Sequence, residues 1–141
     1  MSIVFHYKEI HRPDGTKVKC PMVPVSLSWD EKINTIGLLD SGADISAMPV
    51  SMARLLGLDI SGTPQKSFGI GGEIESVQSV VWVTVEKNHE RYRFQLPVMV
   101  IFGKYDFPIL LGRERFFSKF IVTFDQMEQK VMLKEKKIFA Y

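Results

Sequence analysis

The chain has 141 residues, 45% of them hydrophobic and 24% charged, which predicts one globular domain and excludes a chain that is disordered throughout. Its 18 basic and 16 acidic residues leave a net charge of +2. Glu135 interrupts the basic cluster Lys134, Lys136 and Lys137, so the charge pattern argues against a nucleic-acid partner. The single cysteine, Cys20, excludes an intrachain disulfide framework and fits a reducing compartment.

Two features of the sequence bear on its location. The first twelve residues lack the basic segment and long apolar run of a signal peptide. The longest apolar runs, such as 96–102, are far shorter than the ~18 to 20 residues that cross a bilayer. We therefore predict a cytoplasmic protein with no membrane partner.

Strand-like alternation dominates the chain. Apolar residues recur at every second position, as in half-buried strands, over 3–7, 23–29, 92–102 and 120–124, and the β-branched and aromatic run 80–85 favours a further strand. Turns are predicted at 12–16 and at Asn88. Short helices are predicted over 49–58, which begins with a proline and reaches Gly57, and over 113–120. The pattern predicts a mainly antiparallel, all-β domain with two short helices.

Residues 38–42, Leu-Leu-Asp-Ser-Gly, are the first stretch whose side chains could carry out chemistry. The apolar run ends at Asp40, whose carboxylate can accept backbone N–H groups of the following turn. Gly42 has no Cβ and allows that turn to approach closely, and Ser41 adds a hydroxyl that can donate and accept hydrogen bonds. A turn or capping role is the ordinary interpretation of this triplet taken alone.

Two further stretches are weak signals by themselves. The run Phe68-Gly69-Ile70-Gly71-Gly72 predicts a hairpin tip with exposed backbone amides, and its glycine spacing does not fit a dinucleotide-binding loop. In the second stretch an apolar strand, 109–111, breaks at Gly112 into a short helix. Arg113 at the start of that helix is either a solvated surface residue or the partner of an acid such as Asp44.

The order and spacing of the three stretches resemble those of the retropepsin family, the retroviral-type aspartic proteases and their cellular and prokaryotic relatives. The resemblance spans roughly residues 20–133 and includes a C-terminal strand pair like that of stand-alone prokaryotic members. It implies an all-β, retropepsin-like closed barrel with one lobe per chain. The single domain is expected to comprise an N-terminal hairpin extension of about 1–19, a core of about 20–117 and a C-terminal strand pair of about 118–141.

The resemblance also implies an activity and site residues. Two identical chains would pair so that both copies of Asp40 share one water, which makes the protein a homodimeric aspartic endopeptidase that acts on extended peptides without a metal or cofactor. Ser41, Gly42 and Ala43 would support the active-site loop, and Asp44, Gly112 and Arg113 would brace it near the dimer interface. The run from Phe68 to Gly72 (Phe68, Gly69, Ile70, Gly71, Gly72) would be the flap that binds substrate.

Two alternatives to the protease are considered. One is a retropepsin-like dimer that binds extended peptides as an interaction module but does not cleave them. The intact triplet Asp40, Ser41 and Gly42 favours the enzyme over this module. The other is a structural β domain in which the triplet is fortuitous, and the presence of three motifs in order argues against it.

Overall fold

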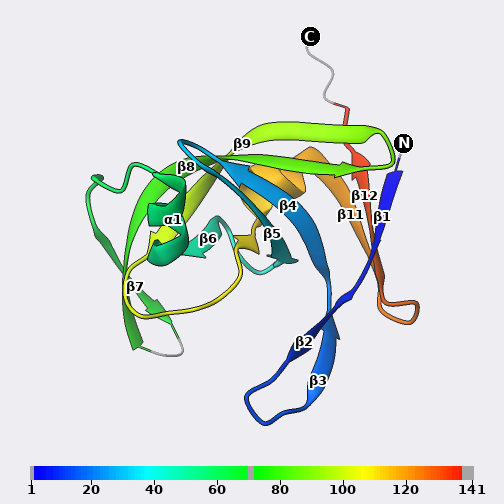
Figure 1. Ribbon diagram of the computed structural model, residues 1–141, viewed down its shortest axis with the longest axis horizontal. Helices are drawn as coiled ribbons and strands as arrows, with labels where there is room; N and C mark the ends of the chain where they lie inside the picture. The colour runs from blue at the N-terminus through cyan, green and yellow to red at the C-terminus, as the bar shows by residue number, and fades with distance from the viewer. Residues whose placement is uncertain (1, 70–71, 138–141) are drawn as a thin grey trace.

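The computed structural model describes residues 2–69 and 72–137, which fold mainly into β-strands (Figure 1). The strands are β1 (Ser2–His6), β2 (Lys8–His11), β3 (Lys17–Cys20), β4 (Met22–Ser28), β5 (Lys32–Leu39), β6 (Ser46–Pro49), β7 (Gln65–Gly69), β8 (Gly72–Lys87), β9 (Glu90–Ile101), β10 (Leu110–Leu111), β11 (Phe120–Asp125) and β12 (Lys130–Glu135). Two short helical segments complete the described fold, α1 (Val50–Leu56) and η1 (Arg113–Phe117). The prediction of an all-β fold with two short helices is confirmed.

A seven-stranded sheet forms the body of the molecule, in the order β4-β5-β10-β6-β9-β8-β7. Strand β4 also pairs with β8, through Ser26–Ser28 against Trp82–Thr84. This extra pairing covers three residues of each strand, and closure into a complete barrel stays a prediction.

The core lies on the inner face of this sheet. Because successive side chains of a strand point to opposite faces, every second residue is buried over 23–27 of β4, 77–85 of β8 and 96–100 of β9. These residues include Val23, Val25, Leu27, Val81, Val83, Val85, Leu96, Val98 and Val100. Burial of each such side chain stabilises the fold by roughly 1.5 to 3 kcal/mol relative to its exposure. The alternation in the sequence therefore assigned the buried face of β4 and β9 correctly, except at Trp29, which lies beyond β4 and is exposed.

The predicted N-terminal hairpin is wrong in its extent. Strand β1 pairs antiparallel with β12, with Ile3 opposite Leu133 and Phe5 opposite Val131, and forms the three-stranded sheet β1-β12-β11. Only β2 and β3 pair with each other, around the predicted turn. The physical reason is burial, because Ile3 and Phe5 lie in the core while most residues of the β2–β3 hairpin are exposed.

The first helical segment matches its prediction. Helix α1 follows Pro49 and ends at Gly57, which adopts a left-handed φ of 74°. Gly57 N–H donates to the Arg54 carbonyl and Leu58 N–H to the Ala53 carbonyl. These two bonds satisfy carbonyls that a helix end otherwise leaves without partners.

The second helical segment is less regular than predicted. The sequence predicts a helix over 113–120, but Glu114 has extended dihedrals and Arg115 a left-handed φ of 72° inside η1. Strand β11 already begins at Phe120, because Phe120 is buried beside Phe94 and Phe116. The chain therefore makes an irregular turn here in place of a continuous helix.

Other turns fall where the sequence predicts them. Strands β8 and β9 form a long hairpin whose two-residue loop is Asn88 and His89, both with positive φ, a conformation that matches the twist of the flanking strands. The predicted C-terminal strand pair is β11 and β12. Among the described residues, no helix has the length and apolar character needed to span a membrane.

Candidate active site

Asp40 lies directly after β5, at the point where two parallel strands end. Leu38 and Leu39 pair with Leu110 and Leu111 of β10, and Leu39 and Leu111 are buried. The backbone N–H of Asp40 donates to the Leu111 carbonyl at 3.0 Å. The apolar strand pair therefore fixes the backbone from which the Asp40 carboxylate projects.

The residues after Asp40 form a tight turn. Gly42 N–H donates to Asp40 Oδ1 at 3.0 Å, and Ala43 N–H donates to the Asp40 carbonyl at 3.2 Å. Asp40 itself is half-buried, whereas Ser41 and Gly42 are exposed. We call residues 40–44 the Asp40 turn. Its local bonds orient one carboxylate oxygen, and within residues 2–69 and 72–137 no hydrogen bond engages Oδ2.

The segment after β10 holds the other end of the Asp40 turn. Arg113 N–H donates to the Ala43 carbonyl and Glu114 N–H to the Asp44 carbonyl, each at 2.9 Å. The Arg113 guanidinium also forms an ion pair with the Asp44 carboxylate. The structure thus brings Asp40 to Asp44 together with Gly112 and Arg113.

Gly112 lies where two backbone segments come close together. A Cβ at this position would lie 2.8 Å from the Ile45 carbonyl carbon and 2.9 Å from Ser46 N, closer than real Cβ atoms approach backbone, and 3.0 Å from the Ala43 oxygen, which is also tight. Gly112 N–H donates to the buried Ser46 hydroxyl at 2.8 Å. Ser46 is a supporting residue that the sequence interpretation missed, and its only signal was a lone hydroxyl in the apolar run after Asp44.

The predicted flap occupies the hairpin of β7 and β8. Phe68 pairs with Glu73 and Gly69 with Gly72, and Gly72 has a φ of +103°. Ile70 and Gly71 lie outside the described residues. No hydrogen bond or ion pair joins the described part of this hairpin to the Asp40 turn.

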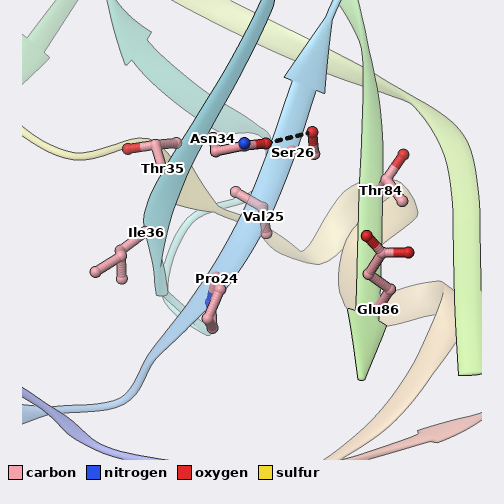
Figure 2. A pocket seen from close by; sticks show the side chains of 8 residues that line it. All are labelled: Pro24, Val25, Ser26, Asn34, Thr35, Ile36, Thr84 and Glu86. Atoms are coloured by element: carbon pink, nitrogen blue, oxygen red, sulfur yellow. Dashed lines mark hydrogen bonds between the residues drawn. The ribbon is translucent and has the colours of Figure 1, made fainter. Parts of the chain in front are cut away.

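A surface hollow lies away from the Asp40 turn. It has a volume of about 360 Å³ and is lined by residues of β4, β5 and β8. Figure 2 shows Ser26 and Asn34, joined by a hydrogen bond of 2.9 Å, with Glu86 on the neighbouring strand. Glu86 is paired with Arg91 at 3.6 Å, and none of the predicted site residues lines the hollow.

Groups that would bind a metal do not gather in the described part of the chain. No set of three or more histidine, cysteine, aspartate or glutamate side chains lies close enough there to hold an ion. The chemistry that the Asp40 turn offers is that of a carboxylate, a hydroxyl and backbone amides.

The chain was compared with solved structures, and three that are similar to it are described here. A retropepsin-like aspartic protease from Rickettsia conorii superposes with a TM-score of 0.60 at 18% sequence identity, over 94% of this chain and 89% of that chain. EIAV protease in complex with the inhibitor HBY-793 gives a TM-score of 0.43 at 24% identity, over 68% and 84% of the two chains. The retroviral protease-like domain of Ddi1 from Leishmania major gives 0.49 at 17% identity, over 85% and 92%.

The first of these superpositions carries the assignment of the fold. It spans nearly the whole chain, so the described strands have the retropepsin-like arrangement that the three motifs predict. No protein-family model and no curated protein matches the sequence. The similarity therefore lies in the three-dimensional arrangement of the strands.

Proposed function

We propose that the protein is an aspartic endopeptidase that acts as a homodimer, with one Asp40 from each chain in its catalytic dyad. The observation that carries this proposal is the Asp40 turn itself, an Asp-Ser-Gly sequence held at the end of β5 within a retropepsin-like fold. The proposed substrate is an extended peptide or an unfolded segment of a protein.

The Asp40 turn suits the role of a rigid acid. Its backbone is held at Asp40 by Leu111 and at Ala43 by Arg113, and Gly42 N–H fixes Oδ1 of the carboxylate. A group whose orientation is fixed before substrate arrives contributes more to catalysis than one that must be ordered during the reaction.

Two such carboxylates that share a water cannot both carry a charge at short distance, so the pair holds one proton. The charged carboxylate removes a proton from the water, whose oxygen then bonds to the peptide carbonyl carbon. The other carboxylate gives its proton to the carbonyl oxygen. As the carbon–nitrogen bond breaks, the carboxylate that took the water proton gives it to the nitrogen, and the other carboxylate takes a proton back from a hydroxyl of the intermediate. The two product chains leave, and the pair again holds one proton.

The remaining predicted residues take supporting roles in this proposal. The exposed Ser41 hydroxyl would hydrogen-bond to the second copy and hold the two turns together. The β7–β8 hairpin would close over the peptide, so that its backbone amides bind substrate carbonyl groups. The ion pair of Asp44 and Arg113 would brace the loop without taking part in the reaction.

The test is the substitution Asp40→Asn, with hydrolysis of β-casein as the readout. A homodimer of this variant lacks both acids of the dyad, so cleavage is expected to fall by roughly a thousandfold or more, while the circular dichroism spectrum and melting temperature stay near those of the wild type. A statine-containing inhibitor should slow the wild type, whereas EDTA and thiol reagents should not.

A matched control is Asp59→Asn. Asp59 also accepts a backbone N–H two residues ahead, from Ser61 at 3.0 Å, so this variant disturbs the same kind of turn at a place with no proposed role in catalysis. It should keep wild-type cleavage. Wild-type turnover by Asp40→Asn would refute the proposal, and peptide binding without cleavage by the wild type would favour the interaction module.

A further inference from the structure

The hairpin of β2 and β3, which we call the arm (Lys8–Cys20), stands apart from both larger sheets. Within the described residues its strands pair only with each other, and Figure 1 shows it projecting from the body of the molecule. A two-stranded hairpin alone is at best marginally stable in water. Contact with a surface outside the single chain would therefore stabilise the arm.

The tip of the arm is a well-formed turn. Thr16 donates to the Asp14 carboxylate through its backbone N–H at 2.9 Å and its hydroxyl at 2.6 Å. These bonds, the hydroxyl bond first, lower the pKa of Asp14. Gly15 supplies the positive φ of 86° that the turn requires. The arm thus has a defined shape before it meets any partner.

One face of the arm is apolar. Ile10 lies opposite Val18, and Cys20, opposite Lys8, continues the same face. Ile10 is 38% exposed, although isoleucine is among the residues most often buried. The other face carries Glu9, His11, Lys17 and Lys19, so only one face offers apolar area to a partner.

The base of the arm lies beside the Asp40 turn. The carbonyl of Pro21, the first residue after the arm, accepts the N–H of Leu39, the residue before Asp40, at 3.0 Å. In Figure 1 the arm and the β7–β8 hairpin project to the same side of the molecule, away from β5 and β6, which the Asp40 turn connects. A second copy that presents its own Asp40 turn must approach on this side.

This inference rests on the proposed function: we propose that the arm of each chain docks on the second copy, beside that copy's β7–β8 hairpin. The arm carries four cationic side chains and two carboxylates, whereas residues 65–69 of β7 and 72–76 of β8 carry one lysine and two glutamates. The opposite net charges favour this contact. A two-fold dimer makes this contact twice, because the arm of each chain would lie on the other chain.

Two variants test the contact. In the first, an Asn-Gly turn replaces residues 9–19, because Lys8 and Cys20 already lie opposite each other and such a turn connects paired strands. The second carries Ile10→Thr and Val18→Thr, which keep the strand preference of the arm. Each should raise the dimer dissociation constant by about tenfold or more, since every dimer loses the apolar contact twice.

The matched control is Ile36→Thr. Ile36 is 39% exposed on β5, nearly the same as Ile10, and lines the hollow in Figure 2. The dimer dissociation constant of Ile36→Thr should equal that of the wild type. Sedimentation equilibrium measures this constant for the wild type and for all of the variants. The wild-type constant should also rise with added salt, because charge contributes to the contact.

The outcomes separate this inference from the proposed function. Dimer constants of both arm variants equal to that of the wild type would overturn the docking of the arm. A changed KM at an unchanged dimer constant would also overturn it, and would assign the arm to substrate binding. Cleavage that survives Asp40→Asn would overturn the proposed function, whatever the sedimentation of the arm variants shows.

Discussion

Gly112 decides how closely the two segments of the candidate site can approach. Three backbone atoms surround the position that a Cβ would take, at 2.8 to 3.0 Å, and backbone cannot yield as the end of a side chain can. We expect Gly112→Ala to destabilise the fold by about 2 kcal/mol. Because the displaced segment includes Ala43, casein cleavage should also fall by about tenfold or more. Urea denaturation and a cleavage assay measure the two effects.

Gly62→Ala provides the comparison. A Cβ on Gly62 would approach one side-chain methyl of Val77 at 3.0 Å, and its cost should stay below about 1 kcal/mol with cleavage unchanged. Equal stability losses in the two variants would show that the close approach at Gly112 does not hold the Asp40 turn.

The sequence could identify the candidate acid, Asp40, but not all of the residues that hold the Asp40 turn in place. Asp40, Gly42 and Arg113 belong to a recognisable spacing, so their proximity could be predicted. The buried bond between Gly112 and Ser46 could not, because it depends on how β6 and the segment after β10 cross. The sequence offered an ion pair with Asp44 as one of two interpretations of Arg113. Because both side chains are exposed, the pair contributes only about 0 to 1 kcal/mol to the stability of the fold.

At the scale of elements, the β8–β9 hairpin contains a titratable contact. The Tyr92 hydroxyl donates to Glu90 at 2.6 Å, and the ring packs edge-on against Phe120 at 5.3 Å. The bond to Glu90, with smaller contributions from burial and nearby charge, raises the pKa of Tyr92 from its ordinary 10.0 to about 12. The neutral hydroxyl is therefore favoured in the folded chain.

This raised pKa predicts a stability change at high pH. Between pH 10 and pH 12 the unfolded chain releases the Tyr92 proton while the folded chain retains it, so the contribution of the bond, complete below pH 10, declines as pH rises. Tyr92→Phe lacks this proton and should lose less stability over the same interval. Urea midpoints at several pH values from 9 to 12 measure the difference, and parallel declines of the two chains would contradict the assignment.

The β7–β8 hairpin offers a second prediction at this scale. Gly72 has a φ of +103°, and among the described residues no atom lies within 4 Å of the position of a Cβ. Gly72→Ala therefore introduces backbone strain without a clash with these residues, at a cost of about 1 kcal/mol. If the hairpin closes on substrate, kcat/KM should fall by about tenfold or more. Asn88→Ala, which strains a positive φ at the other end of β8, should cost similar stability and leave kcat/KM unchanged. Equal kinetic effects would remove the support for a flap.

Strand positions could be read from the sequence more reliably than strand partners. Alternation showed that Ile3 and Phe5 belong to a buried face, but the same pattern fits any neighbouring strand. Their pairing with Leu133 and Val131 spans nearly the whole chain and depends on the position of the C-terminal strands. Likewise, Arg115 gave no sign of its left-handed φ, because that conformation follows from the burial of Phe116 and Phe120, which come after it.

At the scale of the whole molecule, a single chain holds only half of the proposed dyad. The Asp40 turn, the β7–β8 hairpin and the arm are separate features of one chain, and within the described residues no hydrogen bond or ion pair joins the hairpin to the turn. A second copy would bring two Asp40 turns together and would give the arm a surface. Activity should therefore depend on assembly as well as on the residues of each chain.

Mixing of chains tests this dependence. Wild type mixed with an equal amount of Asp40→Asn should exchange subunits, and a dimer with one acid lacks the dyad. Random pairing then leaves about half of the original number of dimers with two acids, so cleavage should fall to about half and decline further as more Asp40→Asn is added. The same variant without its arm should inhibit less, since it pairs more weakly. Cleavage that stays constant at every mixing ratio, after exchange is confirmed with a labelled chain, would show that each chain works alone.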